Sequence, residues 1–346
     1  MSMYEIDPTR DERWERLLAA HPRASIFHTR GWLEALRQTY GYYPVAFTTS
    51  APGLPLTNAL VFCQISNWLK GRRLVSLPFS DHCAPLVGNQ EELDCLLDYS
   101  YRKLKQEKLS YVETRYTRVE EGAGSALNHD HHYWFHTLDL NHPVDELFGR
   151  LHRDCIQRKI RRAAREKLSY EQGVSDELVA KFYQMLLITR RRLGLPAQPI
   201  AWFRNIIGNL SGQVQIRVAS KDGHPIASIL TLKFKDALVY KYGCSDRSHS
   251  SLGGTQLLLW NAILEAKSDG LLELDLGRTD YGDSGLARFK ERWGATRSTL
   301  SYVRHPEGRS ISLSEVVQAN IGKYVWSHAP ESLLAFAGRL LYRHIG

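Results

Sequence analysis

The stretch that decides the fold is LDLGRTDYGDSGLARFKERWGA, which runs from Leu274 to Ala295. It opens as a short apolar strand, passes through a loop that is rich in Gly and Asp, and continues with helical spacing. Phe289 and Trp293 stand four residues apart, so they fall on one helix face and pack on the core. The order of strand, charged loop and helix indicates an α/β domain.

Three charged side chains of this stretch are candidates for chemistry. Asp275 and Arg278 stand where the strand ends, which is where α/β sheets usually carry their ligands. Lys290 directly follows Phe289, so its side chain points to a different side of the helix and can lie away from the core face. A cation beside a reacting carbonyl or phosphate group stabilises the negative charge that develops there. We therefore predict a site at this strand end, with Lys290 and Arg278 as its main cations.

Length and composition limit the class of protein. The chain has 346 residues, 43% of them hydrophobic and 24% charged, which indicates a globular protein of two domains. Its apolar runs are far shorter than the roughly 18 residues that span a bilayer, and its first residues are charged. Five scattered cysteines argue against a zinc site and against a disulfide framework. We expect a cytoplasmic protein with no metal and no tightly bound cofactor.

Both halves of the sequence follow a similar plan. Each predicts helices, a meander of strands, a further helix and a final strand, so the fold class is α/β. The pair Asp222-Gly223 between two strand patterns indicates a hairpin. We place the domain boundary near Asn141, with an N-terminal domain at residues 1–142, a C-terminal domain at 143–309 and a helical tail at 310–346.

A basic helix is predicted from Val144 to Lys167. From Arg150 onward it holds eight Lys or Arg and two acidic residues. One interpretation is a solvated surface helix, because runs of charge usually lie in water. The other is a polyanion site, since guanidinium groups suit phosphate oxygens. Arg158 and Arg162 are then candidates to bind a diphosphate or an RNA backbone, and no DNA partner is predicted.

A second candidate anion site is the start of the next helix, at Gly253-Gly254-Thr255. A strand that ends near Cys244 and a loop rich in Ser precede it. Unpaired backbone N–H groups and the positive end of the helix dipole favour an anionic group at such a place. A plain turn from strand to helix is the alternative interpretation.

Other motifs are weak or missing. The run HDHHYWFH, His129 to His136, lacks the spacing and the further donors of a metal site, so we expect ordinary polar residues at a strand edge. The sequence has no Gly-x-Ser-x-Gly elbow, no Walker loop and no Gly-x-Gly-x-x-Gly fingerprint. These patterns of hydrolases and nucleotide-binding proteins therefore do not explain the chain.

Several segments, in their shared order, make the chain resemble the FemAB-like, GNAT-related acyltransferases, including the cellulose-biosynthesis (CelD-like) branch. They are IRRAAREK (160–167), FYQMLLITRRRLGLP (182–196), YKYGCSD (240–246), LLLWNAILEAKSDG (257–270) and the stretch quoted first. That stretch is the most specific, because an Asp-x-Gly-Arg strand end followed by Gly-Leu-x-x-Phe-Lys-x-x-Trp-Gly rarely arises by chance. The resemblance covers most of the length and implies two tandem GNAT-like α/β domains with a C-terminal helical extension.

The resemblance also implies an activity, which is N-acyl transfer to an amine. It implies that Lys290, in the Phe-Lys pair, assists the transfer, and that Arg192, three residues after Thr189, contacts a substrate diphosphate. Leu193 stands where peptidoglycan-directed members tend to have Asp, which counts against a peptidoglycan precursor as acceptor. The loop before Gly253 keeps the Gly-rich helix start of CoA-binding members but not its spacing.

The reaction needs a deprotonated amine, a stabilised oxyanion and a protonated leaving group. Lys290 is the candidate for charge stabilisation. Tyr242, at a strand end that faces the Gly-rich loop, is the candidate proton donor, although a strand Tyr is more often a core residue. Asp275 is a candidate base, unless it only fixes Arg278.

We expect an acyl-CoA or similar thioester as donor. The expected acceptor is a small molecule or glycan precursor with phosphate groups, on the way to a cell-envelope polysaccharide. One alternative is tRNA-dependent aminoacyl transfer to a peptidoglycan precursor, with aminoacyl-tRNA as co-substrate. Another is an inactive protein of the same fold that binds RNA or a membrane surface. The C-terminal helix could lie on the inner face of the membrane, but docking on the protein body is the commoner behaviour of amphipathic helices.

Overall fold

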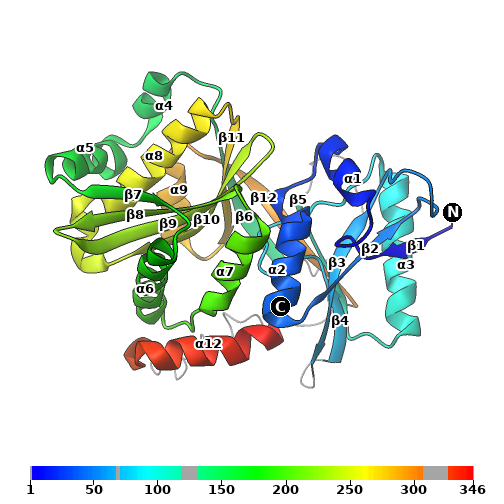
Figure 1. The fold of residues 1–346 in the computed structure, drawn as a ribbon. Helices are drawn as coiled ribbons and strands as arrows, with labels where there is room; N and C mark the ends of the chain where they lie inside the picture. The colour runs from blue at the N-terminus through cyan, green and yellow to red at the C-terminus, as the bar shows by residue number, and fades with distance from the viewer. Residues whose placement is uncertain (1, 68–70, 118–130, 307–325, 346) are drawn as a thin grey trace. The chain divides into compact units, whose positions relative to one another are not determined.

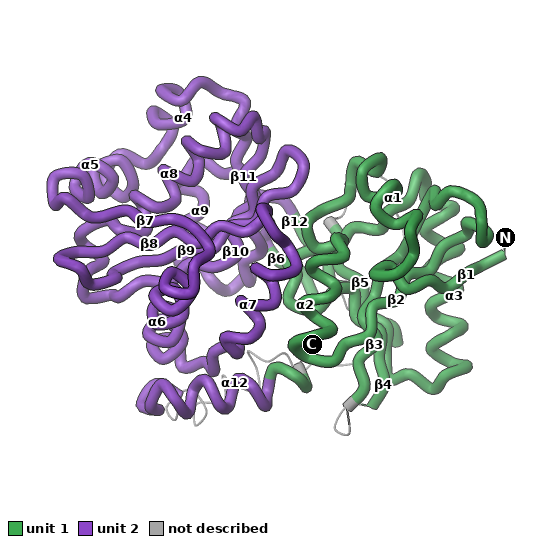
Figure 2. Tube along the Cα trace, viewed as in Figure 1, with its two compact units in different colours: residues 1–133, 299–310, 342–346 green, residues 134–298, 311–341 purple. Residues whose placement is uncertain are grey.

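The computed structural model describes residues 2–67, 71–117, 131–306 and 326–345 (Figure 1). The chain forms two compact units, each a mixture of helices and one sheet (Figure 2). Unit 1 comprises residues 1–133, 299–310 and 342–346, and unit 2 comprises residues 134–298 and 311–341. The α/β class predicted from the sequence is confirmed.

Unit 1 has a sheet in the order β1-β2-β3-β4-β5-β12. Neighbouring strands are antiparallel except for β4 and β5, which are parallel and connected by a helix. The elements are β1 (Tyr4–Ile6), α1 (Trp14–Ala20), η1 (Ile26–His28), α2 (Arg30–Tyr40), β2 (Tyr43–Thr48), β3 (Leu60–Asn67), β4 (Gly71–Val75), α3 (Gln90–Gln106), β5 (Val112–Thr117) and most of β12 (Thr296–His305).

Unit 2 repeats this plan with the strand order β6-β11-β10-β9-β8-β7. In this sheet β10 and β11 are parallel and are again connected by a helix, α8. The elements are β6 (His131–Asp139, from residue 134), α4 (Val144–Arg150), η2 (Arg153–Gln157), α5 (Arg158–Arg165), β7 (Ser169–Gly173), α6 (Asp176–Leu193), α7 (Ile200–Asn209), β8 (Val214–Lys221), β9 (His224–Phe234), β10 (Ala237–Ser245), η3 (Arg247–Leu252), α8 (Gly254–Ser268), β11 (Glu273–Asp280), α9 (Ser284–Glu291) and most of α12 (Glu331–Ile345).

The last strand of each sequence half completes the sheet formed by the other half. β12, which follows α9, pairs antiparallel with β5 in unit 1 over Leu300 to His305. β6, which follows β5 in sequence, lies next to β11 in unit 2. Such long-range pairing is set by tertiary contacts, so a local sequence pattern does not reveal it. The predicted boundary near Asn141 falls in the loop between β6 and α4.

Helices cover both faces of the unit 2 sheet, with α5 and α8 on one face and α6 and α7 on the other (Figure 1). The core under α8 is apolar and includes Leu274, Leu276 and Trp293, none of them more than 2% exposed. In unit 1, α3 packs on Phe47, Phe62 and neighbouring side chains. The predicted packing of Phe289 and Trp293 on the core is confirmed for both rings, whose centroids lie 6.4 Å apart.

The predicted basic helix from Val144 to Lys167 is interrupted. α4 ends at Arg150, and the backbone of Leu151 is extended. The imidazole of His152 then accepts a hydrogen bond from the N–H of Cys155 and starts a π-helical turn that leads into α5. The prediction of one continuous helix was wrong, because this local cap starts a new helix in a stretch whose charge pattern shows no break.

The hairpin prediction at Asp222-Gly223 is confirmed. β8 ends at Lys221 and β9 begins at His224, with positive φ at both turn residues (50° and 79°). This is the backbone that a two-residue turn between twisted strands requires.

The C-terminal helix is amphipathic, and one side is docked in unit 2. Leu334 is buried against Leu187 and Ala197 of the same unit. Gly338 permits this approach, because a Cβ there would lie 1.6 Å from the carbonyl oxygen of Ala197. Phe336 is 60% exposed on the other side, so contact of this helix with a membrane stays a prediction. Residues 310–325 of the predicted tail lie outside the described part of the chain.

Candidate active site

The carboxyl ends of β10 and β11 separate from each other. Their parallel register covers three residue pairs and ends at Val239 opposite Asp275. Both strands continue beyond this point, to Ser245 and Asp280, and a β-bulge interrupts β10 shortly after Val239. Bulges bend a strand and increase its twist, which opens the sheet locally. Such an opening between parallel strands offers main-chain donors and acceptors to an extended ligand.

Lys290 holds the β11 side of this opening. Its side chain is almost fully buried, with 3% exposed, and its ammonium donates to the carbonyl oxygens of Gly277 (2.9 Å) and Arg278 (2.8 Å). A buried charge is costly unless it is hydrogen-bonded, and these two carbonyls supply that compensation. Asp283 fixes the helix that carries Lys290, because its carboxylate caps α9 by accepting from the N–H of Leu286. The structure thus places a fixed positive charge at the end of β11.

Asp275 and Tyr242 are buried at the two sides of the opening. The Asp275 carboxylate accepts a short hydrogen bond (2.6 Å) from the N–H of Gly277, whose φ of 73° lies in the left-handed region. The Tyr242 hydroxyl donates to Gln198 (2.6 Å) and accepts from the indole N–H of Trp202 (2.9 Å). In this geometry Asp275 shapes the strand end and Tyr242 fixes α7 to β10. Their predicted roles as base and proton donor stay predictions.

Two arginines of the predicted site stand at the strand ends. Arg192 is exposed at the end of α6, and its guanidinium donates to the carbonyl oxygen of Ser245, the last residue of β10 (3.4 Å). Arg278 is partly buried in β11, directly after Gly277. Arg192 and Lys290 therefore hold the two strand ends through backbone carbonyls, and Arg278 lies on one of these ends.

The start of α8 meets α5 at close range. Gly253 precedes the helix with a φ of 84°, and a Cβ on it would lie 2.3 Å from the carbonyl oxygen of Lys159 in α5. The Lys159 ammonium donates to the carbonyl oxygen of Ser250 (3.1 Å). Side chains do not cap α8 at Gly253, so the N–H groups of Gly254 and Thr255 lie at a helix start that favours an anion. The structure brings the predicted Gly-rich site and the basic helix together.

Arg158 and Arg162 lie on the outer part of α5. Each has one long ion pair along the helix, Arg158 with Asp154 at 3.7 Å and Arg162 with Glu166 at 3.5 Å; the Arg158 side chain is exposed, and that of Arg162 is half-buried. Exposed pairs of this kind contribute little to stability and are exchanged easily for another anion. The geometry is compatible with both interpretations given to the basic helix.

His136 is a buried residue near Lys290 that the sequence analysis did not single out as a site residue. It lies on β6 with no exposed surface, and neither ring nitrogen has a hydrogen-bond partner within the described residues. Burial, with the charges of Lys290 and Arg297 adding to it, lowers its pKa to about 4. The imidazole is therefore neutral at physiological pH. From the sequence alone, a histidine in a strand is expected at a polar sheet edge. The position of β6 next to β11 is what brings His136 close to Lys290.

An aromatic and cationic stack follows directly on the end of β11. The rings of Trp134 and Tyr281 are stacked with centroids 4.2 Å apart, and the guanidinium of Arg297 lies 4.1 Å from the Trp134 centroid. Tyr281 is 45% exposed. Cation–π contact and stacking fix the loop after β11, which is the loop that the sequence stretch quoted first predicts to carry function.

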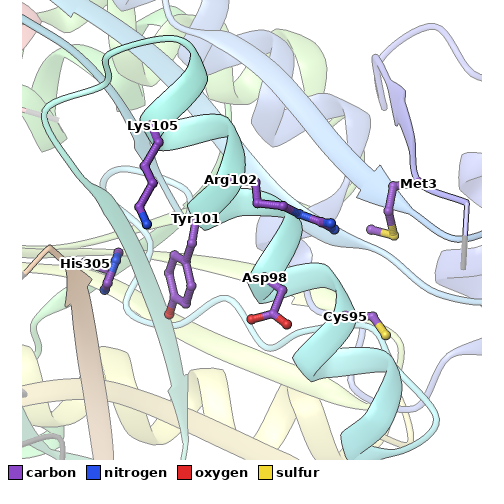
Figure 3. Close-up of a pocket in the computed structure, with 7 residues that line it drawn as sticks. All are labelled: Met3, Cys95, Asp98, Tyr101, Arg102, Lys105 and His305. Carbon is purple, nitrogen blue, oxygen red and sulfur yellow. The ribbon is translucent and has the colours of Figure 1, made fainter.

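Unit 1 contains a separate cavity of about 550 Å³ along α3 (Figure 3). The Tyr101 ring lies against that of His305, with centroids 4.2 Å apart, and Arg102 points toward Met3 on another side. None of the predicted site residues lines it. The described residues hold no group of three or more His, Cys, Asp or Glu that could bind a metal ion. Among the described helices, none is long and apolar enough to cross a membrane.

Comparison with known proteins agrees with this geometry. The family model of the acetyltransferase (GNAT) domain matches residues 150–291, which contain the β10–β11 opening, the α8 start and Lys290. A comparison with curated proteins gives no match.

Solved structures show a similar fold over almost the whole chain. FemX has a TM-score of 0.65 at 15% identity, over 87% of this chain and 97% of FemX. L-PGS from Bacillus licheniformis has a TM-score of 0.55 at 13% identity, over 90% and 97%. A tandem GNAT protein from the clavulanic acid biosynthesis pathway has a TM-score of 0.53 at 12% identity, over 89% and 99%. Residues 150–291 are thus similar to a GNAT acetyltransferase domain, and the chain as a whole is similar in fold to FemX and to a tandem GNAT protein.

Proposed function

We propose that unit 2 transfers an acyl group from a thioester donor to an amine at the carboxyl ends of β10 and β11. The observation that carries the proposal is the separation of these strands beyond Val239 and Asp275, with the buried Lys290 ammonium at one side. An extended donor arm can lie in this opening and form main-chain hydrogen bonds with a strand edge. The guanidinium groups of Arg192 and Arg278 at these strand ends suit an acceptor or donor with phosphate groups.

The proposed donor is an acyl-CoA, with its diphosphate at the start of α8. The N–H groups of Gly254 and Thr255 and the helix dipole suit an anion there. Arg158 and Arg162 would add charge from α5, which is packed against the same loop through Lys159. The match of residues 150–291 to an acetyltransferase (GNAT) domain supports this choice of donor class.

In the proposed step the acceptor nitrogen attacks the thioester carbonyl carbon. A C–N bond forms, the C–S bond breaks, and the proton lost by the amine ends on the leaving thiolate. Lys290 stabilises the negative charge that develops on the carbonyl oxygen. Tyr242 stays the candidate to return the proton, which requires its O–H to turn away from Gln198. Arg192 and Arg278 hold the phosphate groups of the acceptor, for which a glycan or nucleotide-sugar precursor is the proposed class.

Aminoacyl transfer from tRNA is the second candidate function. It rests on the exposed arginines of α5, which suit an RNA backbone, and on the similarity of the fold to FemX. Arg192-Leu193-Gly194 still counts against a peptidoglycan precursor as acceptor.

The test is a donor screen with the purified chain. Acyl-CoAs, acyl carrier protein conjugates and aminoacyl-tRNAs are offered with amino-sugar and nucleotide-sugar acceptors, and products are scored by mass. We expect acylated amine from the CoA thioester, with loss of turnover in Arg192→Ala and normal turnover in the control Arg165→Ala on the exposed side of α5. Turnover with aminoacyl-tRNA alone would replace the proposed donor by the second candidate.

A further inference from the structure

The face of the unit 2 sheet under α8 changes from apolar to polar along two strands. Ala219 in β8 and Ile229 in β9 belong to the core that α8 covers. Because side chains alternate along a strand, the same face continues at every second residue. β8 and β9 are antiparallel, so one direction along this face runs to residues 217 and 215 in β8 and to residues 231 and 233 in β9. Those positions are polar or charged in both strands: Arg217, Gln215, Thr231 and Lys233. Polar residues stand where a helix-covered sheet would normally continue its apolar core.

A cavity of about 320 Å³ lies at this polar end of the face. The helix contributes Ala262 and Ala266, whose small side chains leave space between α8 and the sheet. Glu265 of the same helix and Asp269, which directly follows the helix, also line it. Its size is in the range of small-molecule sites, which begins at about 300 Å³.

The cavity has a built polar wall around Arg217. This side chain is 4% exposed, and its guanidinium is held from three sides. It donates to Thr231 (2.7 Å), to the Tyr170 hydroxyl (3.1 Å) and in a close ion pair to Glu265. Burial, together with the hydrogen bond to Glu265, raises the pKa of Tyr170, so its hydroxyl stays protonated. Arg217 is thus a fixed part of the cavity wall, and its charge is already balanced by Glu265.

The charges of the lining cancel in pairs. Arg217 is paired with Glu265, and Lys233 with Asp269 at 2.8 Å. A ligand with net charge would therefore meet an equal number of like and opposite charges. Gln213 and Gln215 add amide groups, each of which both donates and accepts hydrogen bonds. Ala262, Ala266 and Leu238 form an apolar part of the wall.

We propose that this cavity binds an uncharged, hydroxyl-rich molecule of about the size of one sugar ring. Each hydroxyl both donates and accepts, so it can donate to Glu265 or Asp269 and accept from a glutamine amide or Lys233. The apolar wall suits the C–H face of such a ring. The cavity lies at the beginning of β10, near Leu238 and Leu271, whereas the candidate active site lies at the ends of β10 and β11. It is a second site, and its binding does not rest on the proposed acyl transfer.

The test measures direct binding of glucose, galactose and N-acetylglucosamine by saturation-transfer NMR and calorimetry. Glycine and inorganic phosphate serve as zwitterionic and anionic probes. We expect saturable binding of at least one sugar and none of glycine or phosphate. Gln215→Leu should weaken it about tenfold, the order expected for one or two lost hydrogen bonds. The matched control Gln106→Leu, at an exposed position of α3, should bind normally.

A second variant separates loss of the site from loss of the fold. Ala266→Leu fills the cavity without removing a polar group, so it should abolish sugar binding while thermal unfolding stays cooperative. The proposal is overturned if no sugar binds, if glycine or phosphate binds in preference, or if both variants bind sugar as the parent does. Because the readout is binding alone, failure of acyl transfer in the donor screen leaves this outcome unaffected.

Discussion

Substitution of Lys290 by Met tests the role of the buried ammonium most directly. Methionine keeps an unbranched apolar chain of similar length and removes the charge together with its bonds to the carbonyl oxygens of Gly277 and Arg278. A hydrogen bond to a charged group contributes about 1.5–3 kcal/mol, and relief from burying the charge offsets part of two such bonds. We expect the free energy of unfolding to fall by about 2–4 kcal/mol, which lowers Tm by roughly 5–15 °C.

The effect on turnover should exceed this structural loss. Removal of one fixed charge or donor from a developing oxyanion costs about 10²–10³ in kcat. Turnover is therefore measured at a temperature at which the variant is fully folded by circular dichroism, with the acyl donor found in the screen. Lys290→Arg keeps the positive charge and should retain more activity than Lys290→Met.

Lys267 provides the matched control for Lys290. It is a half-buried lysine of α8 that also donates to a backbone carbonyl, that of Leu140, at the end of the helix away from the opening. Lys267→Met should lower stability by about 1 kcal/mol and leave kcat unchanged. If Lys290→Met and Lys267→Met lose stability alike and both turn over at the parent rate, the catalytic reasoning is wrong. If Lys290→Met unfolds at the parent temperature, the burial argument is wrong as well.

Two further predictions concern stability. Gly253→Ala must adopt a φ of 84° and place a Cβ 2.3 Å from the backbone oxygen of Lys159, so we expect the free energy of unfolding to fall by about 2–4 kcal/mol. The control Gly270→Ala has a φ of 75° but open space around the Cβ, so we expect a fall of about 1 kcal/mol. Equal losses for the two variants in urea unfolding would contradict the packing argument. Burial lowers the pKa of His28 to about 4 from 6.5, so stability is complete above about pH 6.5 and falls as the pH drops toward 4, by about 2 kcal/mol at pH 5. His136 titrates in the same window, so His28→Gln should remove about half of this pH dependence, and an unchanged slope between pH 7 and 5 would count against the assignment.

The local parts of the fold could be predicted from the sequence because local chemistry decides them. α6 has ordinary cap residues at both ends, with the Ser175 hydroxyl accepting from the N–H of Leu178 and Gly194 in the left-handed conformation. The Asp222-Gly223 turn follows in the same way from its residue types. The exchange of β6 and β12 could not be predicted, since any strand of alternating pattern can pair with any sheet edge of suitable register.

The candidate site could be predicted only in part, for the same reason. Lys290 stood out because of its position next to Phe289, but its burial depends on hydrogen bonds to the β11 carbonyls of Gly277 and Arg278. Tyr242 was proposed as a proton donor from its place on a strand, whereas its hydroxyl bonds to Gln198, which lies 44 residues away in sequence. His136 was not predicted as a site residue, because the His-rich sequence that it ends is typical of a polar strand edge. In each case a contact distant in sequence determines what the side chain can do.

The break in the basic helix and the glycine at the start of α8 depend on each other. The extended backbone at Leu151 and the new start at His152 set the direction of α5, and α5 then presents the carbonyl oxygen of Lys159 to Gly253. A side chain at Gly253 would push α5 away, and a continuous helix from Val144 would not bring Lys159 to this loop. The arginines of α5 lie beside the α8 start because of this packing. If an anionic donor binds at the α8 start as proposed, the contribution of these arginines depends on the absence of a side chain at Gly253 as much as on their own charge.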